Sequence, residues 1–328
     1  MQTARSHLTL WAESPEEARI FLARCRRQGF AHPFSHIYVA KRSPKNRSND
    51  YVEGQYFCTS NDEHVTVYEE VIVAPNSIID LVQWCTCDAM ISDGPTPIVV
   101  IEDTTHIVRM NVYQRIPRLF KAALLGVPAM ALQGTRGLDF RLRGDCWGMH
   151  RHMRAYAAIC RLYPTTGVLP FYYIPGDAEK SEAQAEKAAF EYINALVDCD
   201  APTANRIRAQ IIAEVADIDR HGFRGHVAPD IQSIEVARDR VVVHIGAKPE
   251  KKSWREKGSG QMDPYIGMIA AAKYIYCFDA HGNKSKEMVV QFTHVPNDFW
   301  WFRDWRTSKS LYKTLAFEIA DRVEFLGT

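Results

Sequence analysis

The chain has no apolar run of transmembrane length, and residues 1–17 lack the long apolar core of a signal peptide. Its eight cysteines are scattered without a paired framework, which argues against a small secreted domain held together by disulfides. No glycine-rich loop carries the lysine that cradles nucleotide phosphates. We therefore expect a cytoplasmic protein that has no membrane partner.

A strong net charge is also missing. The sequence holds 40 Lys and Arg against 39 Asp and Glu, so its formal charge of +1 says nothing about nucleic acid. The distribution is uneven, because basic residues gather in 41–47, 104–156 and 248–257. Such segments suit contacts to phosphates, although a basic loop is often only a solvated one. The residues that we expect to bind DNA are Arg115, Arg118, Lys121, Arg136, Arg141, Arg143, Lys251, Lys252 and Arg255.

With 328 residues, 46% of them hydrophobic, the chain is long enough for one large domain or two ordinary ones. Near the start, a strand over 7–11 precedes a helix that begins at Ser14-Pro15 and ends at Gly29. An extended segment follows at 64–74. Strands and helices therefore alternate from the start, which favours an α/β fold.

The most informative stretch is 79–106, which predicts a β-hairpin. Its first strand is Ile79 to about Cys85, its second is Pro97 to Asp103, and the turn formers 92–95 lie between them. If the hairpin is symmetric about Ile91, Asp80 lies opposite Glu102 and Val82 opposite Val100. Cross-strand partners are about 5 Å apart, which is close enough for two carboxylates to share one divalent cation.

Two carboxylates at the open end of a buried hairpin repel each other unless a cation or a proton neutralises them. The pair Asp80 and Glu102 therefore indicates a Mg²⁺ site of the kind used in phosphodiester chemistry. Asp93 is a second candidate for the first acid, but it belongs to the hairpin tip, far from Glu102. The plain alternative is that Asp80 caps a strand and Glu102 is a solvated acid at a strand end.

The segment after the hairpin predicts a helix at about 110–125 and then a strand at 127–132. Leu119, Phe120 and Ala123 mark an apolar helical stripe, Pro117 interrupts the pattern, and Gly126 ends it. Hairpin, helix and strand together form an α/β core in which the helix packs on the sheet.

This order of residues resembles the PD-(D/E)xK nucleases, over Ile79 to about Leu132. Ile79-Asp80 stands where the family has Pro-Asp, and Glu102-Asp103-Thr104 stands where it has Asp/Glu-x-Lys, so Thr104 replaces the lysine. The resemblance implies a restriction-endonuclease-like core, a mixed β-sheet flanked by helices, with additional helical and β elements. It also implies Mg²⁺-dependent hydrolysis of double-stranded DNA, as by a Type II restriction enzyme acting as a homodimer.

Within this resemblance, Asp80 and Glu102 hold the Mg²⁺ and the carbonyl of Asp103 is a third ligand. Thr104 can hydrogen-bond the attacking water but cannot supply the positive charge of the missing lysine. That charge would come from His106, or from the basic residues Arg115 and Lys121 named above.

Two further positions complete the predicted site. Gln114, on the helix after the hairpin, lines the site in this interpretation, although Asn111 beside it could simply cap that helix. The adjacent acids Glu69 and Glu70 precede the hairpin, and alternation lets only one of them face the site. Glu70 is our choice for an upstream acid, and a salt bridge at a sheet edge explains the two acids equally well.

We predict an N-terminal region, 1–165, that holds the nuclease core, and a region 166–328 for DNA recognition or dimerisation; one intertwined domain fits equally well. The second part of the chain predicts strands at 236–244 and 288–292. The expected helices are 149–163, 180–197, 204–219, 264–277 and 310–325.

Two other functions remain open. The first is an antiphage or repair nuclease that cuts RNA or single strands. The second is a non-catalytic DNA-binding protein on a decayed nuclease core, which the absent lysine makes reasonable.

Overall fold

The computed structural model describes residues 7–42, 47–58, 63–78, 81, 87–104, 119, 122–123, 125–134, 156, 159–160, 163, 165–173, 178, 181–221, 234–245, 269, 272–277, 284–292, 316 and 319–326. The description covers only the backbone, not the side chains, of those described residues that fall in 40–73, 104, 133–134, 215–221 and 274–275. The contacts divide the chain into two compact units. Unit 1 holds 1–105, 118–135 and 168–212, and unit 2 holds 106–117, 136–167 and 213–328.

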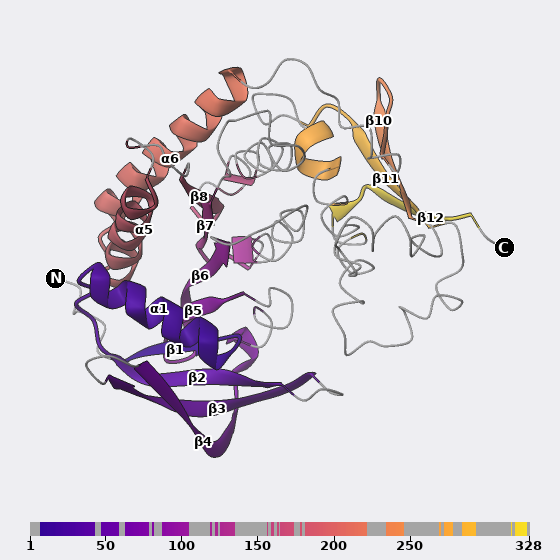
Figure 1. The fold of residues 1–328 in the computed structure, drawn as a ribbon. Helices are drawn as coiled ribbons and strands as arrows, with labels where there is room; N and C mark the ends of the chain where they lie inside the picture. Colours follow the sequence, from indigo (N-terminus) through magenta and orange to yellow (C-terminus); the bar gives the residue numbers. More distant parts are fainter. Residues whose placement is uncertain are drawn as a thin grey trace. The chain divides into compact units, whose positions relative to one another are not determined.

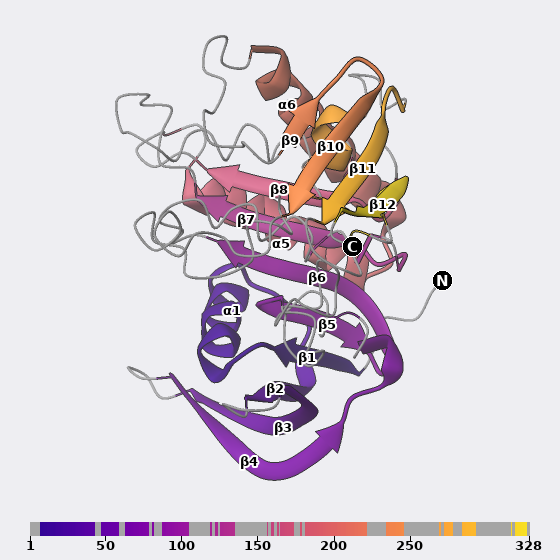
Figure 2. The same cartoon turned by 90° about the vertical axis from the view of Figure 1, so that its right-hand side faces the viewer.

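Unit 1 contains an eight-stranded sheet in the order β4-β3-β2-β1-β5-β6-β7-β8. Figure 2 shows these strands following one another from β4 at the lower edge of the view to β8. The bounds are β1 Leu8–Ala12, β2 Phe34–Arg42, β3 Arg47–Cys58, β4 Glu63–Val73, β5 Ala89–Asp93, β6 Thr96–Thr104, β7 Ala129–Gly134 and β8 Val168–Tyr173.

The directions of these strands make the sheet mixed. β5 is antiparallel to both of its neighbours, β1 and β6, whereas β7 is parallel to β6 and β8 is parallel to β7. On the other side, β2 is parallel to β1, and β3 and β4 continue as an antiparallel meander. The predicted α/β class, a mixed sheet flanked by helices, is confirmed at this level.

Helix α1, Pro15–Arg27, has the termini that its sequence predicts. The hydroxyl oxygen of Ser14 accepts a hydrogen bond from the Glu17 N–H at 3.2 Å, and proline opens the first turn. At the other end Gly29 adopts φ +64°, and the Phe30 N–H donates to the carbonyl of Cys25. This bond satisfies a carbonyl of the last turn, so the helix stops where the glycine stands.

Helix α5, Glu182–Val197, begins with a capping box between Ser181 and Gln184 and is followed by α6, Ala201–His221. Both agree with predicted helices. Figure 1 shows α1 and α5 on the same side of the eight-stranded sheet. They meet there through Phe21 and Phe190, whose stacked rings lie 5.8 Å apart. The apolar layer between helices and sheet is the core of unit 1.

The hairpin that carries Glu102 is present, but the prediction of its first strand is wrong. The first strand is β5, which begins at Ala89, and its register pairs Ala89 with Ile101 and Met90 with Val100. Val82 is therefore not the partner of Val100, and Asp80 is not the cross-strand partner of Glu102. Extending the same register by one residue puts Asp88 opposite Glu102.

A tight turn and a one-residue shift between Ile91 and Ser92 together set this register. Asp93 pairs with Thr96, so the loop consists of only Gly94 and Pro95, and Gly94 adopts φ +54°. Positive φ at the first central position is what short hairpin loops require. The turn formers were correctly identified, but a two-residue loop must be centred on Gly94-Pro95 rather than on Ile91. Asp93 lies at the tip, away from Glu102, as predicted.

The apolar run that suggested a strand at 79–85 has another conformation where it is described. Residues 76–78 form a helical turn, Leu81 is also helical, and the side chains of Ile78 and Leu81 have no exposed surface. A spacing of three residues between buried side chains is helical. Short apolar runs do not distinguish a buried helical segment from a strand.

The helix and strand expected after the hairpin agree with what is described. Leu119, Ala122 and Ala123 are helical and buried, and Gly126 closes the helix with φ +76° while the Val127 N–H donates to the carbonyl of Ala122. β7 follows, parallel to β6. The next strand, β8, lies beyond the predicted boundary at 165 and completes the same sheet, since it pairs with β7 and is buried along its length.

Unit 2 contains a four-stranded sheet in the order β12-β11-β10-β9. Its strands are β9 Ile234–Val236, β10 Arg240–Ile245, β11 Glu287–Phe292 and β12 Arg322–Phe325. β10, β11 and β12 are parallel, and β9 is antiparallel to β10. A π-helical turn, η2 (Ala272–Tyr276), precedes β11. The strands predicted at 236–244 and 288–292 correspond to β10 and β11.

The predicted helix at 310–325 is wrong at its end, because 322–325 form β12. Asp321 fixes the start of this strand: its carboxylate accepts the Met288 N–H at 2.7 Å and a hydrogen bond from Lys284 at 2.6 Å. Burial raises the pKa of this carboxyl, but the bonds from Lys284 and Met288 and the charge of Lys273 lower it more, so the net direction is downward. Pairing with β11 thus overrides the local helical pattern.

No helix among the described residues is both long and apolar enough to cross a membrane. The five described cysteines, 25, 87, 160, 199 and 277, are free thiols.

A close approach at Gly167 generates a prediction for unit 2. A Cβ added to Gly167 would lie 2.5 Å from the Cα of Cys160 and 3.0 Å from its Sγ. Because backbone cannot yield as a flexible side chain can, we expect Gly167→Ala to lower the free energy of unfolding by about 1–3 kcal/mol. Urea denaturation followed by circular dichroism measures this loss. The Cys160→Ala background is the control: a loss that disappears there would mean that the sulfur, not the backbone, causes the clash.

Candidate functional site

The open end of the β5–β6 hairpin brings two acids together. Asp88 directly precedes β5, and Glu102 is the third residue from the end of β6. Asp88 is 6% exposed and Glu102 has no exposed surface. Both residues are therefore largely shielded from solvent. They occupy the cross-strand positions at which neighbouring side chains interact.

The carboxylate of Asp88 ends the ladder between the two strands. Its Oδ2 accepts a hydrogen bond from the Asp103 N–H at 2.6 Å, and its backbone carbonyl accepts one from the Glu13 N–H at 3.2 Å. The side chain thus takes the place of a strand carbonyl. Among the described residues, the pairing of β5 with β6 begins at Ala89, so beyond Asp88 this edge of β6 has no described strand partner.

The backbone of Asp103 lies on this edge of β6. The Val100 N–H donates toward β7, to the carbonyl of Pro128, whereas the Asp103 N–H donates to Asp88 on the other side. The N–H and C=O of one strand residue point the same way, so the Asp103 carbonyl also faces the side of Asp88.

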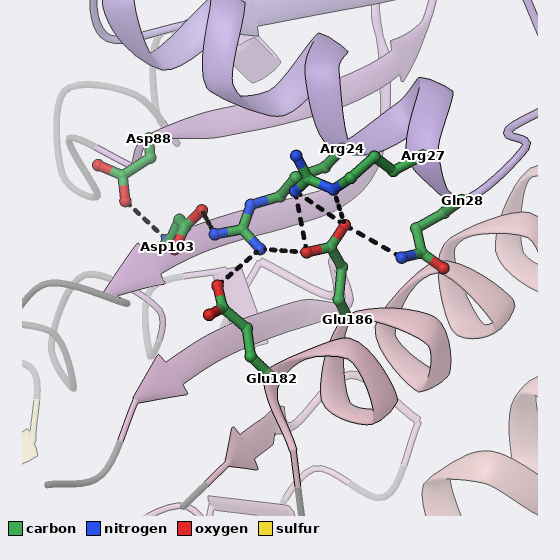
Figure 3. Close-up of polar contacts among 7 residues, drawn as sticks. All are labelled: Arg24, Arg27, Gln28, Asp88, Asp103, Glu182 and Glu186. Carbon is green, nitrogen blue, oxygen red and sulfur yellow. Dashed lines mark hydrogen bonds and ion pairs between the residues drawn. The ribbon is translucent and has the colours of Figure 1, made fainter. Parts of the chain in front are cut away.

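The side chain of Asp103 belongs to a second cluster, drawn in Figure 3. Arg24, on α1, places its guanidinium between the end of β6 and α5. Its Nη2 lies 2.8 Å from Asp103 Oδ2, and its Nη1 lies 2.7 Å from Glu186 Oε2 on α5. The Arg24 side chain is 7% exposed and that of Glu186 is 4% exposed. One guanidinium therefore joins α1, α5 and the end of β6.

Glu186 receives further donors. Arg27 donates to both of its oxygens at 3.1 Å, and the side-chain amide of Gln28 donates to Oε1 at 3.1 Å. Burial raises the pKa of Glu186, but the hydrogen bonds from Arg27 and Gln28 and the charges of Arg24 and Arg27 lower it more. The net result is a pKa below the usual value, so this buried carboxylate is ionised at neutral pH.

Tyr173, at the end of β8, lies close enough to this cluster for its charges to act on the hydroxyl. Burial raises the pKa of its hydroxyl to about 12, and the nearby charges of Glu182 and Asp103 add to the rise while Arg24 opposes it. The phenol therefore stays protonated and is available only as a hydrogen-bonding group near neutral pH.

Of the predicted catalytic and metal-binding residues, Glu102 and Asp103 are fully described. Thr104 ends β6, and only its backbone is described. Glu70 lies in β4, and the strand order places β3, β2, β1 and β5 between β4 and β6. Strand pairing therefore gives Glu70 no place beside Glu102.

The other predicted site residues lie outside the described residues, and their roles stay predictions. They are Asp80, His106, Gln114, Arg115, Arg118, Lys121, Arg136, Arg141, Arg143, Lys251, Lys252 and Arg255.

Sequence reasoning missed Asp88, Arg24 and Glu186. Centring the hairpin on the Gly94-Pro95 turn would have moved the expected partner of Glu102 from Asp80 to Cys87, one residue short of Asp88, because the register shifts by one residue between Ile91 and Ser92. Arg24 and Glu186 carried no such signal, because they are 162 positions apart and each looks like an ordinary charge on a helix.

The donors at the hairpin end fit a hard cation. Carboxylate and carbonyl oxygens are the ligands of Mg²⁺, which also keeps several waters. The part of the chain that the structure describes contains no group of three or more His, Cys, Asp and Glu side chains able to hold a metal. Two carboxylates and a backbone carbonyl, completed by water, do not require such a group.

The buried ion pair generates a prediction about stability. We expect Glu186→Gln to lower the free energy of unfolding by about 3 kcal/mol at neutral pH, because Arg24 loses a charged partner in a buried site. Glu182→Gln is the matched control: that acid is 50% exposed and 3.8 Å from Arg24, so its loss costs at most about 1 kcal/mol. Equal effects of the two substitutions in urea denaturation would contradict the assignment.

The lowered pKa of Glu186 also sets a pH dependence. A carboxyl whose folded pKa lies below its ordinary value of 4.5 stabilises the fold above that value, and this contribution is lost as pH falls through the folded pKa. The stability difference between wild type and Glu186→Gln should therefore be constant at neutral pH and shrink below about pH 4.5. Denaturation curves over this range measure it; a difference that grows on acidification has the wrong sign.

Comparisons with known proteins supply no family for this chain. No protein-family model matches it, and no curated protein or solved structure is significantly similar to it.

Proposed function

We propose that this protein is a Mg²⁺-dependent endonuclease with a restriction-endonuclease-like core, and that Asp88 and Glu102 are its metal-binding carboxylates. One observation carries the proposal: the register of β5 on β6 brings these two buried acids to the open end of one hairpin. Asp88 takes the place that the sequence pattern gave to Asp80. The spacing from Asp88 through Glu102 to Thr104 keeps the arrangement of the PD-(D/E)xK resemblance.

The topology supports the same proposal. The hairpin β5–β6 is followed by helical residues at 119, 122 and 123 and then by β7, parallel to β6. That is the hairpin, helix and strand order which the resemblance implies. α1 and α5 flank the sheet on one side and hold the hairpin end from there.

When bound, Mg²⁺ would stabilise charge on the scissile phosphate and lower the pKa of a water. The residues of the chain have simpler tasks. Asp88 and Glu102 bind the cation, and the Asp103 carbonyl offers a third oxygen. Thr104, at the end of β6, offers a hydroxyl that can orient the attacking water. The positive charge that the family takes from its lysine has to come from another residue, for which His106, Arg115 and Lys121 stay the candidates.

The substrate that we propose is double-stranded DNA, held by the basic segments 41–47, 136–154 and 248–257. A cytoplasmic Type II restriction enzyme, cutting both strands as a homodimer, is the form of the proposal that the resemblance favours. The missing lysine favours a second candidate, a DNA-binding protein that has lost catalysis.

The test is cleavage of a long unmethylated duplex DNA in Mg²⁺ or Mn²⁺ by wild type, Asp88→Asn, Glu102→Gln and Asp80→Asn. We expect wild type to give discrete fragments. Asp88→Asn and Glu102→Gln should lose at least about 100-fold in rate, because several kcal/mol of charge stabilisation disappear with the cation. Asp80→Asn should cleave like wild type.

Other results separate the alternatives. Loss of activity in Asp80→Asn with full activity in Asp88→Asn would reverse the assignment of the first acid. Cleavage of RNA or single strands alone would indicate an antiphage or repair role. Intact DNA with binding that survives removal of both acids would support the non-catalytic protein.

A further inference from the structure

We propose that Arg24 is a positioning residue for the metal site, acting through Asp103 on Asp88. The inference rests on the proposed function and extends it to a residue that touches neither metal nor substrate. It assigns a task to the ionic cluster of Arg24, Asp103 and Glu186, whose members come from three different elements.

The contact between Arg24 and Asp103 is short and largely shielded from solvent. The two side chains are 7% and 13% exposed, and the atoms Nη2 and Oδ2 are 2.8 Å apart. A charge-assisted bond of this length in a place with little water fixes the direction of the Asp103 side chain. Because Asp103 is the next-to-last residue of β6, fixing its side chain also fixes the backbone at the end of the strand.

Asp103 connects this contact to the proposed metal site through its backbone. The Asp103 N–H donates to Asp88 Oδ2 at 2.6 Å and thereby orients one proposed metal ligand. The Asp103 carbonyl, a proposed third ligand, belongs to the same residue. Glu102, the second carboxylate ligand, precedes it directly. A shift of Asp103 would therefore displace all three ligands together.

The two contacts of this cation suit an arginine, because its guanidinium offers two nitrogens. Its fork reaches Asp103 with one nitrogen and Glu186 with the other, the latter at 2.7 Å. Without this cation, the acids Asp103, Glu182 and Glu186 would repel one another in a poorly solvated place. A lysine has the charge but presents a single nitrogen and cannot reproduce the two-armed geometry.

Glu186 makes the arrangement rigid. Gln28 and Arg27 hold the Glu186 carboxylate from the end of α1, so Arg24 is bound to a partner that is itself fixed. Residues beyond the ligands of a metal orient them, and their loss typically weakens metal binding or activity by about 10- to 100-fold. Arg24 fits this role at the end of β6.

The experiment is a titration of the full chain with Mn²⁺, in which electron paramagnetic resonance reports free Mn²⁺. Wild type, Arg24→Met and Arg24→Lys are compared at a temperature at which circular dichroism shows each to be folded. We expect both Arg24 variants to bind Mn²⁺ about 10- to 100-fold more weakly than wild type. The lysine variant keeps the charge and carries the test if the methionine variant does not fold.

Arg27→Met is the matched control. Arg27 is on the same helix and contacts the same Glu186, but it is 57% exposed and is not among the partners of Asp103. Because Gln28 and Arg24 still hold Glu186 in this variant, we expect its Mn²⁺ affinity to fall much less than that of the Arg24 variants. A second readout is the amide signal of Asp103 in NMR spectra without metal, which should move in the Arg24 variants far more than in Arg27→Met.

The outcomes separate this inference from the proposed function. If Asp88→Asn abolishes Mn²⁺ binding while both Arg24 variants bind like wild type, the positioning role is overturned and the metal site stands. If Arg27→Met weakens binding as much as Arg24→Met, general loosening of α1 and α5 is the cause and the inference also fails. If wild type does not bind Mn²⁺ at all, the metal site and the positioning role fall together.

Discussion

The register of β5 against β6 decides which acids meet at the open end of this hairpin. A loop of only two residues, Gly94 and Pro95, and a one-residue shift between Ile91 and Ser92 together fix that register, because the turn and the alternation of buried side chains must agree. A slip by one residue would move Glu102 to the other face of the sheet. Extending the observed pairing by one residue beyond Ala89 puts the buried acids Asp88 and Glu102 at opposite positions, and every chemical role that we assign to this chain depends on this arrangement.

The opposite surface of the same strand end carries the ionic cluster around Arg24. Burying an ion pair adds little net stability, since desolvation offsets most of the attraction, but leaving one member unpaired is costly. Such a cluster therefore acts mainly on geometry: the contacts of Arg24 with Asp103 and Glu186 hold α1, α5 and β6 in the observed placement. In this protein, that placement also fixes the backbone next to Glu102.

Much of the fold could be predicted from local signals. Ser14-Pro15 and Gly29 delimit α1, Gly126 ends the following helix, and the α/β class follows from the alternation of patterns. The first strand of the hairpin was misplaced because the apolar run 79–85 resembles a strand, whereas its described part is helical. The end of the chain, predicted as a helix, pairs as β12 instead. The partnership of Arg24 with Glu186 depends on tertiary packing alone, and no local pattern in the sequence encodes it.

The central claim is that Asp88 and Glu102 bind one divalent cation. Anomalous diffraction from crystals of the full chain grown with Mn²⁺ tests it most directly, because the signal locates the ion without reference to activity. The account predicts one strong peak within coordination distance of carboxylate oxygens from both Asp88 and Glu102. A peak held by other residues, or no peak at this hairpin end in crystals that bind Mn²⁺ elsewhere, would contradict it.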